Sequence, residues 1–203
     1  STATSNPATF IINGTGTVTA KYKLKEFAVT VVNANTGWGT VSASGTVEYG
    51  KNFTISASPV ANYDFNTWTI TNGSTVTTLK NNATIAANEL VAIKGTVTVQ
   101  AGFKPKVYAI TIAQNPAGAG ALPAVGTQQI AYNDTFSISA SANAGYTFTG
   151  WTIAPSGSIL LISGTTGDAN IKVQVKAEGT LTANFSGIQY TVTVQSSNSN
   201  YGQ

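Results

Sequence analysis

A stretch of eighteen residues occurs twice in this chain, and its two copies begin 83 positions apart. The first copy, FTISASPVANYDFNTWTI, covers residues 53–70, and the second, FSISASANAGYTFTGWTI, covers residues 136–153. Both alternate apolar with polar residues, which is the period of a half-buried β-strand. A repeat unit of about 82 residues is longer than the 20–50 residues of stacked solenoid repeats, so small domains threaded in a row are expected.

Strand-like segments also mark where each unit opens and closes. A closing aromatic residue lies five positions before an opening one in three places: Tyr22 and Phe27, Phe103 and Tyr108, Phe185 and Tyr190. These landmarks predict the following divisions: residues 1–25 as C-terminal strands of a preceding repeat, 26–104 and 105–187 as complete repeats, and 188–203 as the first strand of a following repeat. The linkers are then four residues long, and because one contains Pro105, a semi-rigid rod is expected.

The composition favours an all-β fold. Only 8% of the residues are charged, while Thr, Val and Ile are frequent and strong helix formers are scarce. We expect tandem β-sandwich-like or β-grasp-like domains, with about seven strands in each. For the first unit these strands are predicted near 27–33, 44–49, 52–58, 65–71, 74–79, 84–94 and 96–103. The stretch ATIAANELVAIKG, which includes the sixth of these, could instead support a helical turn.

The repeated aromatic residues are the candidate core of each unit. They are Tyr63, Phe65 and Trp68 in the first unit and Tyr146, Phe148 and Trp151 in the second. Each tryptophan lies an odd three positions after its phenylalanine, so either the strand is bulged before it or its side chain packs on the opposite face. Gly150 favours the bulge, because glycine accommodates unusual dihedral angles. An exposed aromatic platform for sugars is the alternative interpretation.

These motifs resemble a known family. GYTFTGWT at Gly145–Thr152, preceded by FSISASANA and followed by GTLTANF at Gly179–Phe185, is similar to the divergent form of the internalin-type B-repeat. The first unit departs from that pattern, since Asn62 and Thr67 stand where it has glycines. The resemblance implies an extracellular, cell-surface protein, because such repeats occur in secreted or surface-anchored proteins as stalks, adhesin segments or interaction modules.

The side chains present offer little chemistry. Without His or Cys there is no Ser–His or Cys–His nucleophile and no common zinc site. We therefore expect no catalytic residue, no cofactor and no metal site; Asp168 and Asn170 offer too few ligands for calcium. Lysines are scattered and arginine is absent, which argues against nucleic-acid binding. No apolar run is long enough to insert in a membrane as a helix.

A glycine-flanked turn carries the candidate interaction loop. Trp38 stands there in the first unit, and the aligned positions are Ala119 and Tyr201. An aromatic residue that varies between units in this way is expected to contact either a ligand or the neighbouring domain, and we favour the domain.

The leading hypothesis from sequence is a structural stalk or fibre segment, whose partners are neighbouring repeats or copies of itself. The alternative is an adhesin-type module that recognises surface glycans or proteins through its loop tips. Because residues 1–25 and 188–203 read as incomplete repeats, copies could also assemble by donating strands to one another. A longer array of repeats is the simpler interpretation of the same ends.

Overall fold

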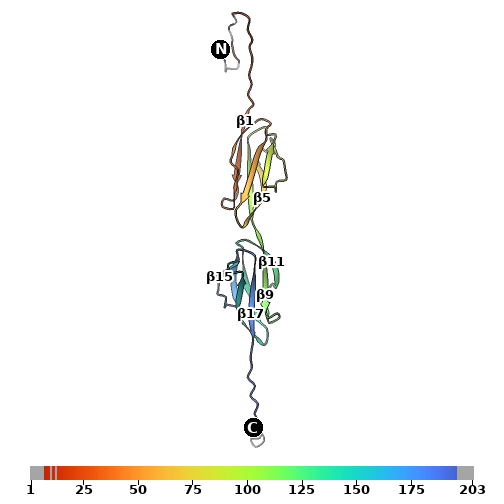
Figure 1. The fold of residues 1–203 in the computed structure, drawn as a ribbon, viewed down its shortest axis with the longest axis vertical. Helices are drawn as coiled ribbons and strands as arrows, with labels where there is room; N and C mark the ends of the chain where they lie inside the picture. The colour runs from red at the N-terminus through yellow and green to blue at the C-terminus, as the bar shows by residue number, and fades with distance from the viewer. Residues whose placement is uncertain (1–6, 10, 12, 196–203) are drawn as a thin grey trace.

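The structure is a computed structural model that describes residues 7–9, 11 and 13–195 of the chain. Two β units follow one another along the long axis, and residues 13–25 and 188–195 extend from opposite ends (Figure 1). The described residues form strands and no helix. The prediction of an all-β fold made of tandem repeat domains is therefore confirmed.

The first unit contains two four-stranded sheets, one with strand order β3-β1-β8-β5 and one with order β2-β4-β7-β6. Its strands are β1 (Glu26–Asn33), β2 (Gly39–Val41), β3 (Gly45–Glu48), β4 (Phe53–Pro59), β5 (Tyr63–Asn72), β6 (Thr78–Leu79), β7 (Ala87–Val91) and β8 (Val97–Pro105). β1 and β8 are parallel neighbours, whereas the other pairs of strands in both sheets are antiparallel.

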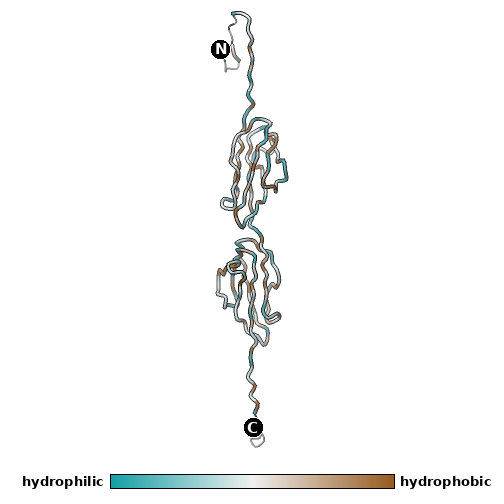
Figure 2. Tube along the Cα trace, viewed as in Figure 1, coloured by the Kyte–Doolittle hydropathy of each residue, from teal (hydrophilic) through white to brown (hydrophobic). Residues whose placement is uncertain are grey.

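One hydrophobic core lies between these two sheets. Val29 and Val99 enter it from the first sheet, and Ile55 and Leu90 enter it from the second. The alternation along the strands, visible as changing hydropathy along the chain in Figure 2, turns every second side chain inward. Of the two architectures that the sequence left open, the unit has the two-layer sandwich.

The second unit repeats this plan with one sheet divided. Its strands are β9 (Val107–Asn115), β10 (Gly120–Ala121), β11 (Gly126–Ala131), β12 (Thr135–Ser139), β13 (Ser141–Ala142), β14 (Tyr146–Ala154), β15 (Ile159–Ser163), β16 (Asn170–Val175) and β17 (Gly179–Gly187). The sheet orders are β11-β9-β17-β14, β12-β16-β15 and β10-β13. β9 and β17 are parallel, as β1 and β8 are in the first unit.

Several sequence expectations differ from the structure in detail. The first unit has eight strands, because the three-residue strand Gly39–Val41 pairs with β4 although its glycine-rich surroundings signal only a turn. The helical turn considered within ATIAANELVAIKG is wrong, since Ala87–Val91 pairs with both β4 and β6. The four-residue linker is also wrong between the two units, where only Lys106 separates β8 from β9.

The described parts of the two end segments contain no strand. Tyr22 and Tyr190, which the sequence placed in terminal strands, are exposed, as are Val18 and Val194. A strand needs a neighbouring strand for its backbone groups, and no strand pairs with the described residues of either segment. The terminal strands predicted from sequence are therefore not seen within residues 13–25 and 188–195, and the rest of both predictions lies outside the described residues.

Candidate functional site: the joint between the two units

The joint between the two units is built around the backbone of Lys106. Its N–H donates to the carbonyl of Asn62 in the first unit, over 2.9 Å, and its carbonyl accepts the N–H of Tyr132 in the second unit, over 2.8 Å. Both polar groups of the single connecting residue are thus held, one by each unit. A linker bonded on both sides cannot rotate without breaking a hydrogen bond, so the joint resists bending.

Aromatic rings extend this contact across the joint. The ring of Trp38 stacks on that of Tyr63 with their centroids 4.7 Å apart. The other neighbour of Tyr63 is the ring of Tyr132 in the second unit, which meets it edge to face at 5.6 Å. Such pairs are each worth about 0.5–1.5 kcal/mol beyond the area they bury. The three rings therefore form a continuous series from one unit into the next.

Asn62 adds a side-chain bond to the joint. Its Oδ1 accepts a hydrogen bond from the Tyr108 hydroxyl of the second unit, over 2.7 Å. Its backbone has a φ of 69°, in the left-handed region where asparagine is better tolerated than most residues. Glycine would fit this turn equally well, and Gly145 occupies the equivalent turn of the second unit with a φ of 84°. The asparagine supplies an acceptor that a glycine lacks.

The turn that carries Trp38 is held against the same end of the first unit. The Trp38 carbonyl accepts the N–H of Val60, which begins the turn containing Asn62. A Cβ on Gly39 would overlap the ring of Phe103, a buried residue 5% exposed. The glycine after the tryptophan is therefore required for close packing of the turn on the closing strand.

Parts of this joint recur at the outer ends of the two units. The Lys25 carbonyl accepts the N–H of Tyr49 ahead of the first unit, as the Lys106 carbonyl does from Tyr132. The N–H of Ile188, after the second unit, donates to the Gly145 carbonyl. The backbone connection is thus a property of the repeat. Trp38 and Asn62 are specific to the first unit, since Ala119 and Gly145 occupy the equivalent positions.

The structure exchanges two of the roles predicted from sequence. Tyr63, a predicted core residue, lies opposite Pro105 at the end of its strand, beyond the core, where it joins the units. Trp38, the predicted loop-tip contact, is half-buried and packs against the core of its own unit. Among the aromatic contacts of the described residues, the ring of Trp38 meets Tyr63, and the ring of Tyr63 meets Tyr132 of the second unit, so this domain contact is indirect. Tyr201, the other predicted loop residue, lies outside the described residues.

The remaining predicted core aromatics do lie in or against the cores. Trp68 and Trp151 are buried, and Phe65, Tyr146 and Phe148 are half-buried and packed on the core. The bulge favoured from sequence is present in both units, as a shift in pairing between Phe65 and Thr67 and between Phe148 and Gly150. The indole N–H groups donate to backbone carbonyls, so neither tryptophan is a free platform for sugars.

The loop considered for calcium is held by its own hydrogen bonds. The Asp168 carboxylate accepts from the backbone N–H and the hydroxyl of Thr165, and the Asp168 carbonyl accepts from the Trp151 indole. Across the described residues, no three acidic side chains gather closely enough to hold a metal ion. In the same part of the chain, no helix is long and apolar enough to cross a membrane.

Sequence reasoning missed Lys106 and Tyr132 as residues of the joint. A signal for Tyr132 was available, because Tyr49 and Tyr132 occupy the same place in the two units, directly after a strand of the first sheet. Nothing in the sequence distinguishes Lys106 from the other scattered lysines, because its backbone makes the two hydrogen bonds of the joint. Its side chain adds an ion pair, with the ammonium 4.0 Å from the carboxylate of Asp64 in the first unit.

Comparison with known proteins agrees with the repeat described above. No curated protein matches the sequence. A family model described as the divergent InlB B-repeat domain matches twice, at residues 28–107 and 110–189, which together form most of the chain and coincide with the two sandwiches. The family is a non-catalytic repeat type. The chain therefore belongs to the divergent InlB B-repeat domain family.

Proposed function

We propose that this chain is a tension-bearing stalk segment of an extracellular surface protein. B-repeat domains of this kind are typical of bacterial surface proteins, which supports the location. The observation that carries the mechanical role is the placement of the strands by which the chain enters and leaves each unit. β1 and β8 are parallel neighbours in one sheet, and so are β9 and β17.

Parallel terminal strands resist extension because of their geometry. The chain enters at the start of β1 and leaves at the end of β8, so pulling the ends apart slides one strand along the other. Five residue pairs, from Val29 opposite Val97 to Asn33 opposite Ala101, are then loaded together. In the second unit six pairs share the load. Strands pulled apart in a zipper geometry would instead break their hydrogen bonds one at a time.

The joint supports the same role, since force must pass from β8 to β9 through Lys106. That residue is bonded to both units, and the rings of Tyr63 and Tyr132 meet beside it. A stiff connection keeps the pulling direction along the strands of both units.

An adhesin-type binding module is the alternative function. The described residues give it less support, because the Trp38 ring is already stacked on Tyr63. An open hollow on the second unit, lined in part by Ser137, Ser163 and Lys172, has no aromatic side chain against which a sugar could stack.

Assembly of copies by strand complementation also has less support. The register of the intact units would place Val194 of one copy opposite Val18 of another, as Val31 lies opposite Val99. These two strands would pair without the neighbouring strand that carries the buried tryptophan and without the second sheet. An isolated pair of strands is only marginally stable in water. The stalk proposal does not depend on this contact.

Single-molecule stretching tests the mechanical role. Pulled from its two ends, the chain should show two unfolding events, each adding roughly 230–260 Å, because about 80 extended residues span ~3.3–3.6 Å each and the folded unit already spans about nine strand residues. The chain has no cysteine, so single cysteines define other attachment points cleanly. Attachment at Lys25 and Gly50, beside the antiparallel β1 and β3, loads the first unit as a zipper.

The unfolding force should be several-fold higher in the end-to-end geometry than in the zipper geometry. Equal forces in the two geometries would refute the proposed role of the parallel terminal strands.

A further inference from the structure

The outer edge of β15 in the second unit is an apolar strand edge. In the sheet order β12-β16-β15, one side of β15 pairs with β16, and the other side has no partner among the described residues. Leu160 and Ile162 are 42% and 51% exposed on this strand, whose sequence ILLIS contains no charge. A β-propensity-rich, uncharged edge is a template for pairing with another strand.

The first unit protects the equivalent edge. In the first unit, Phe53 lies opposite Leu90, which in turn lies opposite Leu79. In the second unit, Phe136 lies opposite Val173, which in turn lies opposite Leu161. Leu79 of β6 therefore corresponds to Leu161 of β15. This places Thr78 and Lys80 at the positions that Leu160 and Ile162 occupy in the second unit.

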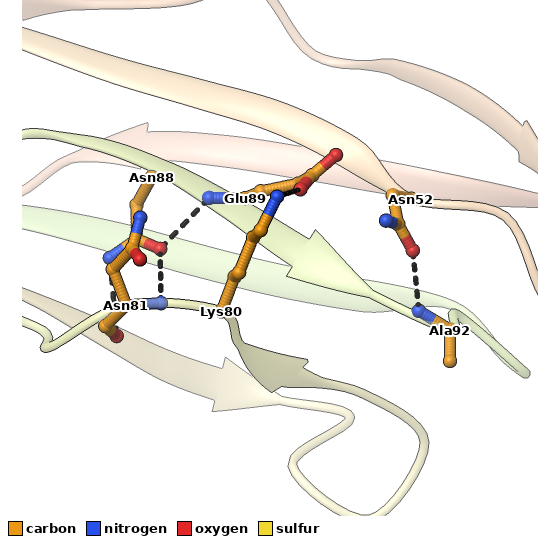
Figure 3. Close-up of polar contacts among 6 residues, drawn as sticks. All are labelled: Asn52, Lys80, Asn81, Asn88, Glu89 and Ala92. Carbon is orange, nitrogen blue, oxygen red and sulfur yellow. Dashed lines mark hydrogen bonds and ion pairs between the residues drawn. The ribbon is translucent and has the colours of Figure 1, made fainter.

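A polar cluster holds the protected edge in place. The Lys80 ammonium lies 2.9 Å from the Glu89 carboxylate, as Figure 3 shows. The Asn88 side chain accepts a hydrogen bond from the N–H of Asn81, directly after that lysine. Edge strands that are short and carry lysine resist pairing, because an added strand would have to desolvate the charge. β6 has two strand residues, whereas β15 has five.

We propose that β15 is a lateral docking edge, and that its occupant is β15 of a second copy of this chain. An antiparallel pair related by a two-fold axis at Leu161 would place Leu160 of each copy opposite Ile162 of the other, the residue at which β15 is bulged against β16. Leu160 and Ile162 are both exposed, so all four apolar side chains lie on the solvent face of the joined sheet. The strand is therefore complementary to itself, as an isologous contact requires. Because neither copy brings a charge to this edge, no like charges meet across the axis.

The size of the edge predicts how strong the contact is. A five-residue strand pair buries less than the ~1,200 Å² of a stable interface, so one contact gives a weak dimer. Rods lying side by side would present several such edges to one another. Once one pair of edges has formed, the effective concentration of the remaining edges is higher, so the weak contacts together bind more tightly than one contact alone. The β15 contact would thus join stalks laterally. This proposal concerns an edge outside the joint and does not require the tension-bearing role.

Sedimentation velocity over a concentration series into the millimolar range tests the pairing. The unaltered chain should shift from monomer to dimer with rising concentration. Leu160→Lys, at an exposed position, should remain monomeric and keep its far-UV circular dichroism and thermal unfolding. Thr78→Lys, the matched change at the first unit's edge, should dimerise as the unaltered chain does.

Cysteine cross-linking tests the two-fold register. Leu161→Cys should form a disulfide-linked dimer under mild oxidation, since the residue lies opposite itself in the proposed pair, and Leu79→Cys, the equivalent change in the first unit, should not. A chain that stays monomeric throughout the series, or a Leu160→Lys variant that dimerises normally, would overturn the proposal. Binding of an unrelated extended peptide to β15 by a chain that remains monomeric would likewise reject self-pairing and assign the edge to a different partner.

Discussion

Replacing Tyr132 with alanine should weaken the first unit, although the residue belongs to the second. Its ring meets Tyr63 edge to face across the joint, a contact worth about 0.5–1.5 kcal/mol. Adding Asn62→Gly removes the acceptor of the Tyr108 hydroxyl, worth a further 0.5–1.5 kcal/mol or so, while keeping the left-handed turn. The two changes together should remove about 1–3 kcal/mol of coupling between the units, which is roughly a 5–150-fold change in an equilibrium constant.

Denaturant unfolding followed by tryptophan fluorescence measures this coupling. Trp151 is the one tryptophan of the second unit, so a Trp151→Phe background reports the first unit through Trp38 and Trp68. In that background, Tyr132→Ala should lower the free energy of unfolding of the first unit. Tyr132→Phe keeps the ring and is the matched control, expected to preserve the coupling.

An unchanged first unit would refute the proposed coupling. If Tyr132→Ala alters its free energy of unfolding by less than about 0.3 kcal/mol, the two sites are behaving as distant, independent ones. NMR relaxation gives a second readout: the two units should tumble as one body in the unaltered chain and more independently in the doubly substituted one.

Two further changes test other contacts. Gly39→Ala and Gly120→Ala should each cost about 1–3 kcal/mol by overpacking, because a Cβ would enter the ring of a buried phenylalanine. Gly187→Ala, where the space is open, is the control, and equal thermal unfolding of all three would contradict the packing. The hydrogen bond from Lys80 lowers the pKa of Glu89 below its ordinary 4.5. The Lys80–Glu89 pair therefore contributes to folding stability above pH 4.5, and this contribution is lost as the pH falls through the lowered pKa of Glu89. Lys80→Met should return the Glu89 pKa toward 4.5 in a carboxyl NMR titration, and no change would show that the pair does not form.

The repeat itself explains why the fold could be predicted. Comparing the two copies of the pattern shows which residues both units share. The two-residue period of a β-strand then assigns each shared residue to one face of the sheet. The odd spacing from Phe65 to Trp68, repeated from Phe148 to Trp151, indicates either a bulge or a tryptophan on the opposite face. Gly150 favours the bulge, and both units contain it. These are local properties, fixed by residues adjacent in sequence.

The place of Tyr63 could not be predicted in the same way. Tyr63 shares a face of its strand with Phe65, so the two-residue period of the strand assigns both residues to the core. That period does not indicate where along the strand the core ends. That limit is set by the opposing sheet, and Tyr63 lies beyond it, opposite Pro105. The aromatic landmarks failed at the linker for a related reason. Backbone pairing continues past Phe103 to Pro105 and resumes at Val107, because hydrogen bonds between strands do not require the aromatic side chains.

The differences between the two units discussed above lie at the joint and at one sheet edge. The parallel terminal strands, the bulge and the buried tryptophan occur in both units, as expected if each must fold and carry load alone. Trp38 and Asn62 distinguish the first unit at the joint, whereas Leu160 and Ile162 distinguish the second at its sheet edge. A repeat whose sandwich is fixed can change only its ends and its edges without losing its core. In the functions proposed above, the first change sets how stiffly neighbouring units are connected along the rod, and the second determines whether rods can pair side by side.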